Sequence, residues 1–386
     1  MSRGTQVPIT PEVLSWTINS SGYSAEEVAE RIHVPADKLR SWMSGSAKPG
    51  LTLLRQLASF LRRPLATFLL PAPPRSMNQQ IEFRHPPGET RHTLNSTELT
   101  HLREAARLQR GLGWILTELG EPSADIPRIS PTISPQRAAE EHRRRVGVDV
   151  DQQLEWRTDT QSLHAWRQAL QGMKVIVLLL PMGSSSARGF SLWNEYAPLI
   201  AVNTHWNAAA RTFTLFHEYA HLLTRTNSAC TGHVTARIRQ GEDSLERWCE
   251  EFAAEFLAPW TRVRDCLVHD YDWRQGQIID DLPLVKRLAA KFHISLRAMT
   301  IKLIDHEVAS WELYRQILPQ ADDKRGGGGG EGRRRLQIRV DEYGERTAQV
   351  LLKGLERDVL SRTDVLGYLD IADSDLDILG SRVTTR

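Results

Sequence analysis

The spacing of apolar positions predicts a mostly helical chain with a small sheet near its middle. Apolar residues recur every three to four positions over residues 97–119, which is the period of one buried helix face. The same period predicts helices over residues 208–223 and 243–257. Two short runs, residues 174–180 and 198–203, are continuously apolar or nearly so and predict buried strands. We therefore expect an α+β fold in which helices dominate.

Changes in composition divide the chain into segments. Prolines after residue 70 break a series of short predicted helices. Five consecutive glycines after Arg325 disfavour helix and strand and predict a flexible linker. The segments we expect are an N-terminal helical domain (1–72), a helical connector (73–136), a central domain (137–320), a Gly/Arg-rich linker (321–335) and a small helical C-terminal module (336–386).

Composition excludes some classes of protein. The net charge is +2, from 49 Lys+Arg and 47 Asp+Glu, so overall charge favours neither nucleic acid nor a membrane surface as partner. The apolar runs are far shorter than the roughly 18 residues of a membrane span, and the first residues lack the apolar segment of a secretory signal. The three cysteines are not in a CxxC spacing, which is typical of a reducing compartment. We expect a cytoplasmic protein without a membrane partner.

The strongest chemical signal is the sequence His217-Glu218-Tyr219-Ala220-His221 within a predicted helix. Two histidines four residues apart lie on one helix face, so both imidazoles can reach the same cation. Glu218 lies about 100° further around the axis and points beside the metal. There a carboxylate can take a proton from water and return it to a leaving amine. Zn²⁺ suits two histidines and a carboxylate, whereas two unrelated histidines on an apolar helix would each need another buried partner.

A third ligand must come from elsewhere in the chain. The positions where an extended motif would place a downstream glycine and histidine hold threonine and asparagine instead. On the next predicted helix, Glu246 and Glu250 lie four residues apart beside an apolar stripe. One can be a ligand and the other can orient a ligating histidine, and the spacing alone does not assign these roles. Glu251 and Glu255 fit an ordinary solvated acidic face.

Three stretches together resemble the ImmA/IrrE family of metallopeptidases: residues 197–203 (APLIAVN), 212–223 (TFTLFHEYAHLL) and 246–259 (ERWCEEFAAEFLAP). The resemblance implies a gluzincin-like domain with His217, His221 and Glu246 as zinc ligands and Glu218 as general base. Two positions depart from the family pattern. Thr212 stands where an arginine is usual, and Glu250 stands where an asparagine is usual, which alters the surroundings of the ligands but removes none of them.

Residues 23–61 resemble a Cro/repressor-type (XRE) helix-turn-helix, with Ser24 placed to cap the first helix of the motif. The resemblance implies binding to double-stranded DNA, and the candidate contacts are Lys38, Arg40 and Ser41. Residues 1–80 hold nine Lys/Arg and five Asp/Glu, a balance of only +4, and Asp37 near the reading edge would repel phosphate. His33 replaces the glycine usual at the turn. A partner-docking or dimerising role is the alternative.

The resemblance implies a zinc endopeptidase that cleaves a specific repressor- or antitoxin-like regulator, in a switch of the stress, phage or toxin–antitoxin type coupled to DNA binding and transcription regulation. The alternative is a catalytically silent transcriptional regulator, or an antitoxin-like binding protein, that retains the metallopeptidase fold. A third reading is a protein that acts by contact alone through its C-terminal module. Tyr196 and His233 are candidates for stabilising an oxyanion.

Overall fold

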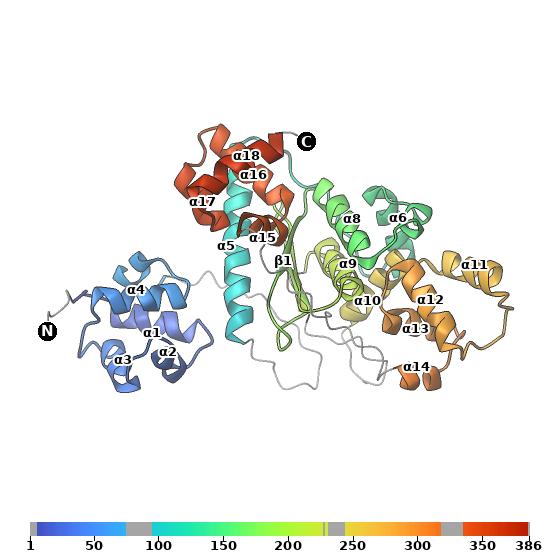
Figure 1. The fold of residues 1–386 in the computed structure, drawn as a ribbon, viewed down its shortest axis with the longest axis horizontal. Helices are drawn as coiled ribbons and strands as arrows, with labels where there is room; N and C mark the ends of the chain where they lie inside the picture. Colours follow the sequence, from blue (N-terminus) through green and yellow to red (C-terminus); the bar gives the residue numbers. More distant parts are fainter. Residues whose placement is uncertain (1–5, 75–94, 227, 231–243, 318–334, 385–386) are drawn as a thin grey trace. The chain divides into compact units, whose positions relative to one another are not determined.

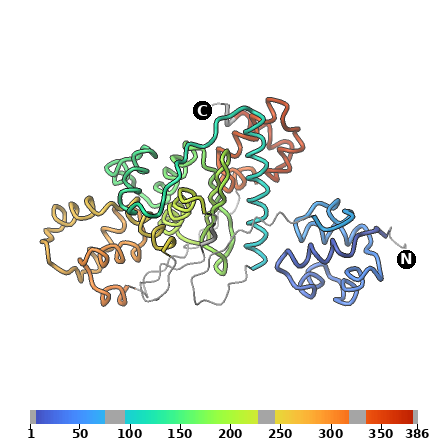
Figure 2. Tube along the Cα trace, turned by 180° about the vertical axis from the view of Figure 1, so that it is seen from behind, coloured from blue at the N-terminus to red at the C-terminus, as the bar shows by residue number. Residues whose placement is uncertain are grey.

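The computed structural model describes residues 6–74, 95–226, 228–230, 244–317 and 335–384 (Figures 1 and 2). Its contacts divide the chain into two compact units. The first holds the described residues up to 74 together with 95–104, and the second holds the rest. None of the helices described is both long enough and apolar enough to pass through a bilayer. The predicted class is confirmed: helices predominate and one small sheet lies in the second unit.

The first unit packs short helices around one apolar core. Ser24 caps α2 through a capping box with Glu27, as its position predicts. His33 has φ +57°, so this histidine adopts the left-handed conformation that the turn before α3 requires. Val28 and Trp42 are buried in the core. The elements are α1 (Pro11–Asn19), α2 (Ala25–Arg31), α3 (Ala36–Met43), α4 (Leu51–Phe60), the 3₁₀ helix η1 (Leu65–Leu69) and the start of α5 (Ser96–Glu118).

The sheet of the second unit has four strands in the order β1-β3-β2-β4. β1 and β3 are parallel and correspond to the two predicted runs, whereas β2 pairs antiparallel with both β3 and β4. β1 begins two residues later than the apolar run because Lys174 has φ +68°, which is incompatible with a strand. The strands are β1 (Ile176–Leu180), β2 (Gly189–Leu192), β3 (Leu199–Asn203) and β4 (Ser228–Cys230).

Helix α9 (Ala208–Thr224) is buried because it packs against β2 and β3, against α8 (Asp159–Gly172) and against α10 (Ser244–Leu257). Phe216 of α9 stacks on Phe256 of α10 at 4.1 Å between ring centroids, and Trp166 of α8 meets Phe216 edge-on. α10 also packs against α6 (Pro135–Val146). The remaining helices of this part are α7 (Val150–Leu154), α11 (Trp260–Tyr271), α12 (Leu282–Phe292), α13 (Leu296–Asp305) and α14 (Trp311–Ile317).

The C-terminal helices pack against the sheet. α15 (Arg335–Tyr343) lies against the edge strand β1. The buried guanidinium of Arg167 donates to the carbonyls of Asp341 and Glu342, at the end of α15, and to that of Val177 in β1. Figures 1 and 2 show α15–α18 gathered beside α5, on the side of the sheet opposite α11–α14. The other helices of this group are α16 (Glu345–Glu356), α17 (Arg362–Leu369) and α18 (Asp373–Thr384).

Two glycines that weaken the predicted helix over residues 97–119 do not interrupt α5. A Cβ atom at Gly111 would collide with the hydroxyl of Tyr368 in α17. The absence of a side chain therefore allows the C-terminal helices to approach α5 closely.

Glu255 on α10 corrects the prediction of a solvated acidic face. Its side chain is 13% exposed and lies 2.5 Å from Nζ of Lys302 on α13, which is 5% exposed. The other carboxylate oxygen accepts the backbone N–H of Trp260. The period of α10 could not show this, because the partner that buries Glu255 comes from a helix nearly fifty residues later in the chain.

Candidate metal centre

α9 presents its two motif histidines from one buried face. Asn207 caps the start of the helix by accepting the N–H of Ala210. His217, Glu218 and His221 are 3%, 0% and 1% exposed, so the surroundings of all three are set by the packing of α9. The helix ends at Arg225, which has the left-handed φ of +61°. The motif thus lies on a rigid element and close to its C-terminal end.

Glu246 in the first turn of α10 completes a cluster with the two histidines. The Nε2 atoms of His217 and His221 are 3.2 Å apart. The carboxylate oxygens of Glu246 lie 3.2 Å from Nε2 of His217 and 3.4 Å from Nε2 of His221. Two zinc bonds of 2.0–2.1 Å at a tetrahedral angle would place their donor atoms about 3.3 Å apart. The donor set and its spacing therefore fit a tetrahedral zinc ion.

The electrostatics of the cluster favour an ionised ligand. Burial raises the pKa of the Glu246 carboxyl, but hydrogen bonds from His217 and His221 outweigh burial and hold this pKa well below its usual range. Within the described chain, these three residues form the one group of three or more His, Cys, Asp and Glu side chains whose ligand atoms all lie within 4.8 Å of one another.

Glu218 extends toward strand β2, which passes very close to α9. A Cβ atom built on Gly189 of β2 would lie 3.4 Å from Cγ of Glu218 and only 2.6 Å from Cγ2 of Thr214. Glycine at this position allows the strand to lie directly over the helix. The side chain of Glu218 is thus fully buried, with its Cγ atom next to β2.

Thr226 is a further residue of this site that the sequence analysis missed. Its Oγ1 lies 2.9 Å from Nδ1 of His221, on the side of the ring opposite the cluster. Periodicity gives no signal for this contact, because positions five apart in a helix do not face each other. The contact depends on the left-handed conformation of Arg225, which reverses the chain after α9.

The remaining predicted residues are less completely placed. Glu250 lies one turn after Glu246 on α10 and is partly buried, and its role in orienting a histidine stays a prediction. Tyr196 is partly buried and its backbone N–H donates to Asn194 Oδ1. His233 lies outside the described residues.

The DNA-contact candidates lie on α3 and are engaged within the first unit. The guanidinium of Arg40 forms ion pairs with Glu26 of α2 and, at 2.9 Å, with Asp37 of α3. Nζ of Lys38 is 5.9 Å from the centroid of the Trp42 ring. Ser41 donates its hydroxyl to the carbonyl of Lys38. The positive charge of Arg40 is thus countered by two carboxylates on the surface that the helix-turn-helix resemblance assigns to DNA.

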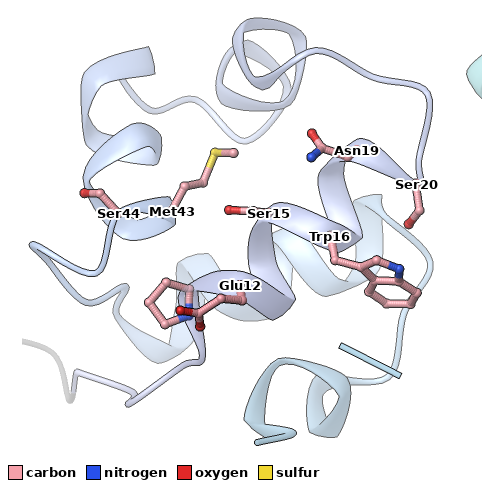
Figure 3. Close-up of a pocket in the computed structure, with 8 residues that line it drawn as sticks. Glu12, Ser15, Trp16, Asn19, Ser20, Met43 and Ser44 are labelled. Carbon is pink, nitrogen blue, oxygen red and sulfur yellow. The ribbon is translucent and has the colours of Figure 1, made fainter. Parts of the chain in front are cut away.

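The first unit also contains an open cavity of about 680 Å³. In Figure 3 the side chains of Ser15 and Met43 extend toward each other from α1 and α3, whereas Trp16 extends away from Met43. The cavity belongs to a different unit from the metal cluster. Its lining residues are Pro11, Glu12, Ser15, Trp16, Asn19, Ser20, Met43 and Ser44.

Comparison with protein-family models finds one match in this part of the chain. Residues 171–303 match Peptidase_M78, the IrrE N-terminal-like domain. The matched segment runs from the end of α8 through the sheet, α9 and α10 to α13, and so contains the whole metal cluster. No curated protein matches the chain. Residues 171–303 are thus similar to the peptidase domain of the ImmA/IrrE family, and the match supports a metallopeptidase.

Proposed function

We propose that this chain is a zinc-dependent endopeptidase in which His217, His221 and Glu246 hold the metal and Glu218 is the general base. The observation that supports the proposal most directly is the convergence of two imidazoles and one carboxylate, from two packed helices, at separations that suit one tetrahedral ion. The family match over the same residues is independent support for this chemistry.

The chain's own residues would divide the work of peptide hydrolysis. When bound, zinc supplies a Lewis acid that polarises a carbonyl and makes water a better nucleophile. Glu218 accepts a proton from the attacking water as the water oxygen adds to the carbonyl carbon. The same carboxyl group then gives that proton to the amine nitrogen as the C–N bond breaks. The burial of Glu218 beside β2 limits its side-chain motion, which favours this transfer.

We further propose a narrow substrate, a repressor- or antitoxin-like regulator, cleaved in the cytoplasm. The helix-turn-helix resemblance of the first unit supports a regulatory setting, with double-stranded DNA as its partner. Cys249 and Cys266 are buried thiols, which suits a reducing compartment.

The test is cleavage of candidate regulators encoded beside this gene, using purified zinc-loaded chain and its Glu218→Gln variant. We expect the wild type to cut one regulator at a defined bond. The variant should bind the same amount of zinc and cut about 10²–10⁴-fold more slowly, because only proton transfer is lost. Equal rates for the two proteins would contradict the assigned role of Glu218. A zinc-loaded wild type that cuts none of the regulators but binds one of them would favour a silent regulator.

Action through the C-terminal module alone has less support. The buried contacts of Arg167 with α15 and with β1 tie this module to the domain that carries the metal cluster. Its removal would expose the edge of β1, so loss of partner binding in a truncated chain would not by itself identify a binding module.

A further inference from the structure

The hydrogen bond between His221 and Thr226 bears on which ring nitrogen of His221 can bind a metal. An imidazole that ligates through Nε2 must carry its proton on Nδ1, and the group that receives this proton decides how well that tautomer is held. Nε2 of His221 faces Glu246 and His217, and Nδ1 faces Thr226 Oγ1 at 2.9 Å. Thr226 is therefore the group placed to accept the Nδ1 proton.

Thr226 in turn has acceptors for its own hydroxyl proton. Its Oγ1 lies 2.9 Å from Oγ1 of Thr224 and 3.4 Å from the carbonyl oxygen of His221. The hydroxyl of Thr224 can donate to the carbonyls of Ala220 and His221, at 3.2 and 3.1 Å. These groups form a run of hydrogen bonds from His221 through Thr226 to Thr224. With Nδ1 of His221 protonated, each donor along this run has an acceptor, and the run ends on carbonyl oxygens that only accept.

The backbone that places Thr226 is held from two other segments. Arg225 is left-handed, and this reversal lets the N–H of Thr226 donate to the carbonyl of His221 at 3.0 Å. The guanidinium of Arg225 lies 3.3 Å from the centroid of the Trp193 ring and donates to the carbonyls of Leu222 and Ile126. A non-glycine residue with positive φ persists only where its surroundings fix it. The position of Thr226 beside Nδ1 of His221 is thus fixed by the structure of the helix end.

We propose that Thr226 is a positioning residue of the metal site, which holds His221 in the tautomer and ring orientation that present Nε2 to the cation. The inference rests on the proposed function only in that the cluster binds zinc, and it needs no catalysis. Replacing Thr226 by valine keeps the volume of the side chain but leaves the Nδ1–H of the buried His221 ring without its acceptor. Loss of such an outer partner of a ligating histidine costs about 10–100-fold in metal affinity.

The experiment measures the zinc affinity of the full-length chain by competition with a chromogenic chelator. Thr226→Val is compared with Thr226→Ser, which keeps the hydroxyl, and with Thr224→Val, which alters only the far end of the run. Thermal unfolding of the zinc-free proteins checks that each variant is folded, and the cobalt(II) absorption spectrum reports the ligand field without reference to activity.

We expect Thr226→Val to bind zinc about 10–100-fold more weakly, Thr226→Ser to restore most of the affinity, and Thr224→Val to have a smaller effect. Unchanged zinc affinity in folded Thr226→Val would overturn the inference. Equal losses in the valine and serine variants would also overturn it, because they would show that packing and not the hydroxyl matters. A wild type that binds no zinc would overturn the proposed function itself. A wild type that binds zinc without cleaving peptides would leave the role of Thr226 standing.

Discussion

Charged side chains are held differently at two places in this chain, one in each unit. In the second unit, Arg167 and Lys302 are buried, and each is fixed by partners from distant segments. On α2 and α3 of the first unit, Glu26, Asp37 and Arg40 are exposed, and both carboxylates pair with Arg40 on the surface. Buried charges need exact partners, whereas exposed pairs are screened by water and contribute little. The positions of these buried groups are therefore set by the fold, whereas the exposed groups are open to a partner that meets their surface.

The largest effect should come from the buried pair of Glu255 and Lys302. Burial lowers the pKa of Lys302, and Glu255 opposes that shift. Glu255→Leu leaves the ammonium without its carboxylate and should lower the free energy of unfolding by about 3–5 kcal/mol. Urea unfolding at neutral pH measures this.

The matched control for this pair is the double variant Glu255→Leu, Lys302→Met, which removes both charges and should recover most of the lost stability. If the single variant loses less than about 1 kcal/mol in its free energy of unfolding, the pair behaves like a surface ion pair. The contrast between this buried pair and the exposed pairs of Arg40 would then fail.

His142 gives the second prediction, through pH. His142 is fully buried, and its Nδ1 atom lies 3.1 Å from the hydroxyl of Tyr219. Tyr219 lies on α9 between the two motif histidines. Burial lowers the pKa of His142 to about 4, Glu141 opposes the shift and Arg145 adds to it. An unfolded histidine has a pKa near 6.5, so between these values the unfolded chain binds the extra proton. The contribution of neutral His142 to the free energy of unfolding should therefore be fully present above about pH 6.5. It should fall by up to about 3 kcal/mol as the pH drops toward 4.

The measurement is the free energy of unfolding of zinc-free protein at pH 7 and at pH 4.5, for the wild type and for His142→Phe. The variant should lose less stability on acidification because it lacks the titrating group. Identical losses in the two proteins would show that His142 is not held neutral in the folded chain.

The smallest effect concerns the surface of α3. If this unit binds DNA, Asp37 opposes it, because its carboxylate pairs with Arg40 and repels phosphate. Asp37→Asn should strengthen binding by less than about tenfold, and Arg40→Ala should lower the slope of log affinity against log salt by about one. Gel shifts at several salt concentrations measure both. Weaker DNA binding by Asp37→Asn would contradict this, and no shift of wild type at low salt would remove DNA as the partner.

The sequence predicts the local features of the structure better than the features that join distant parts of the chain. Local patterns located α9 and α10 to within one or two residues, and they identified the stripe of α10 because its apolar period is unbroken. Ser24 caps α2, as its place in the resemblance to a helix-turn-helix predicts. These features depend on neighbours within one helix or one turn.

The features that the sequence did not predict depend on residues far apart in the chain. Glu255 is buried only because Lys302 reaches it from α13. Thr226 meets His221 only because Arg225 is left-handed, and that conformation is held by Trp193 and Ile126. Strands β2 and β4 are four and three residues long and carry no period of their own. The apolar period of a helix or strand contains none of this information, because it identifies the buried face of that element and not the distant residues that pack against it.

The central claim is that His217, His221 and Glu246 form a zinc site, and its most direct test is the metal content of the purified chain. Elemental analysis of wild type and of His217→Ala, both prepared without chelator, should give about one zinc per chain in the wild type and almost none in the variant. A wild type without metal, which takes up none when zinc is added, would contradict the claim.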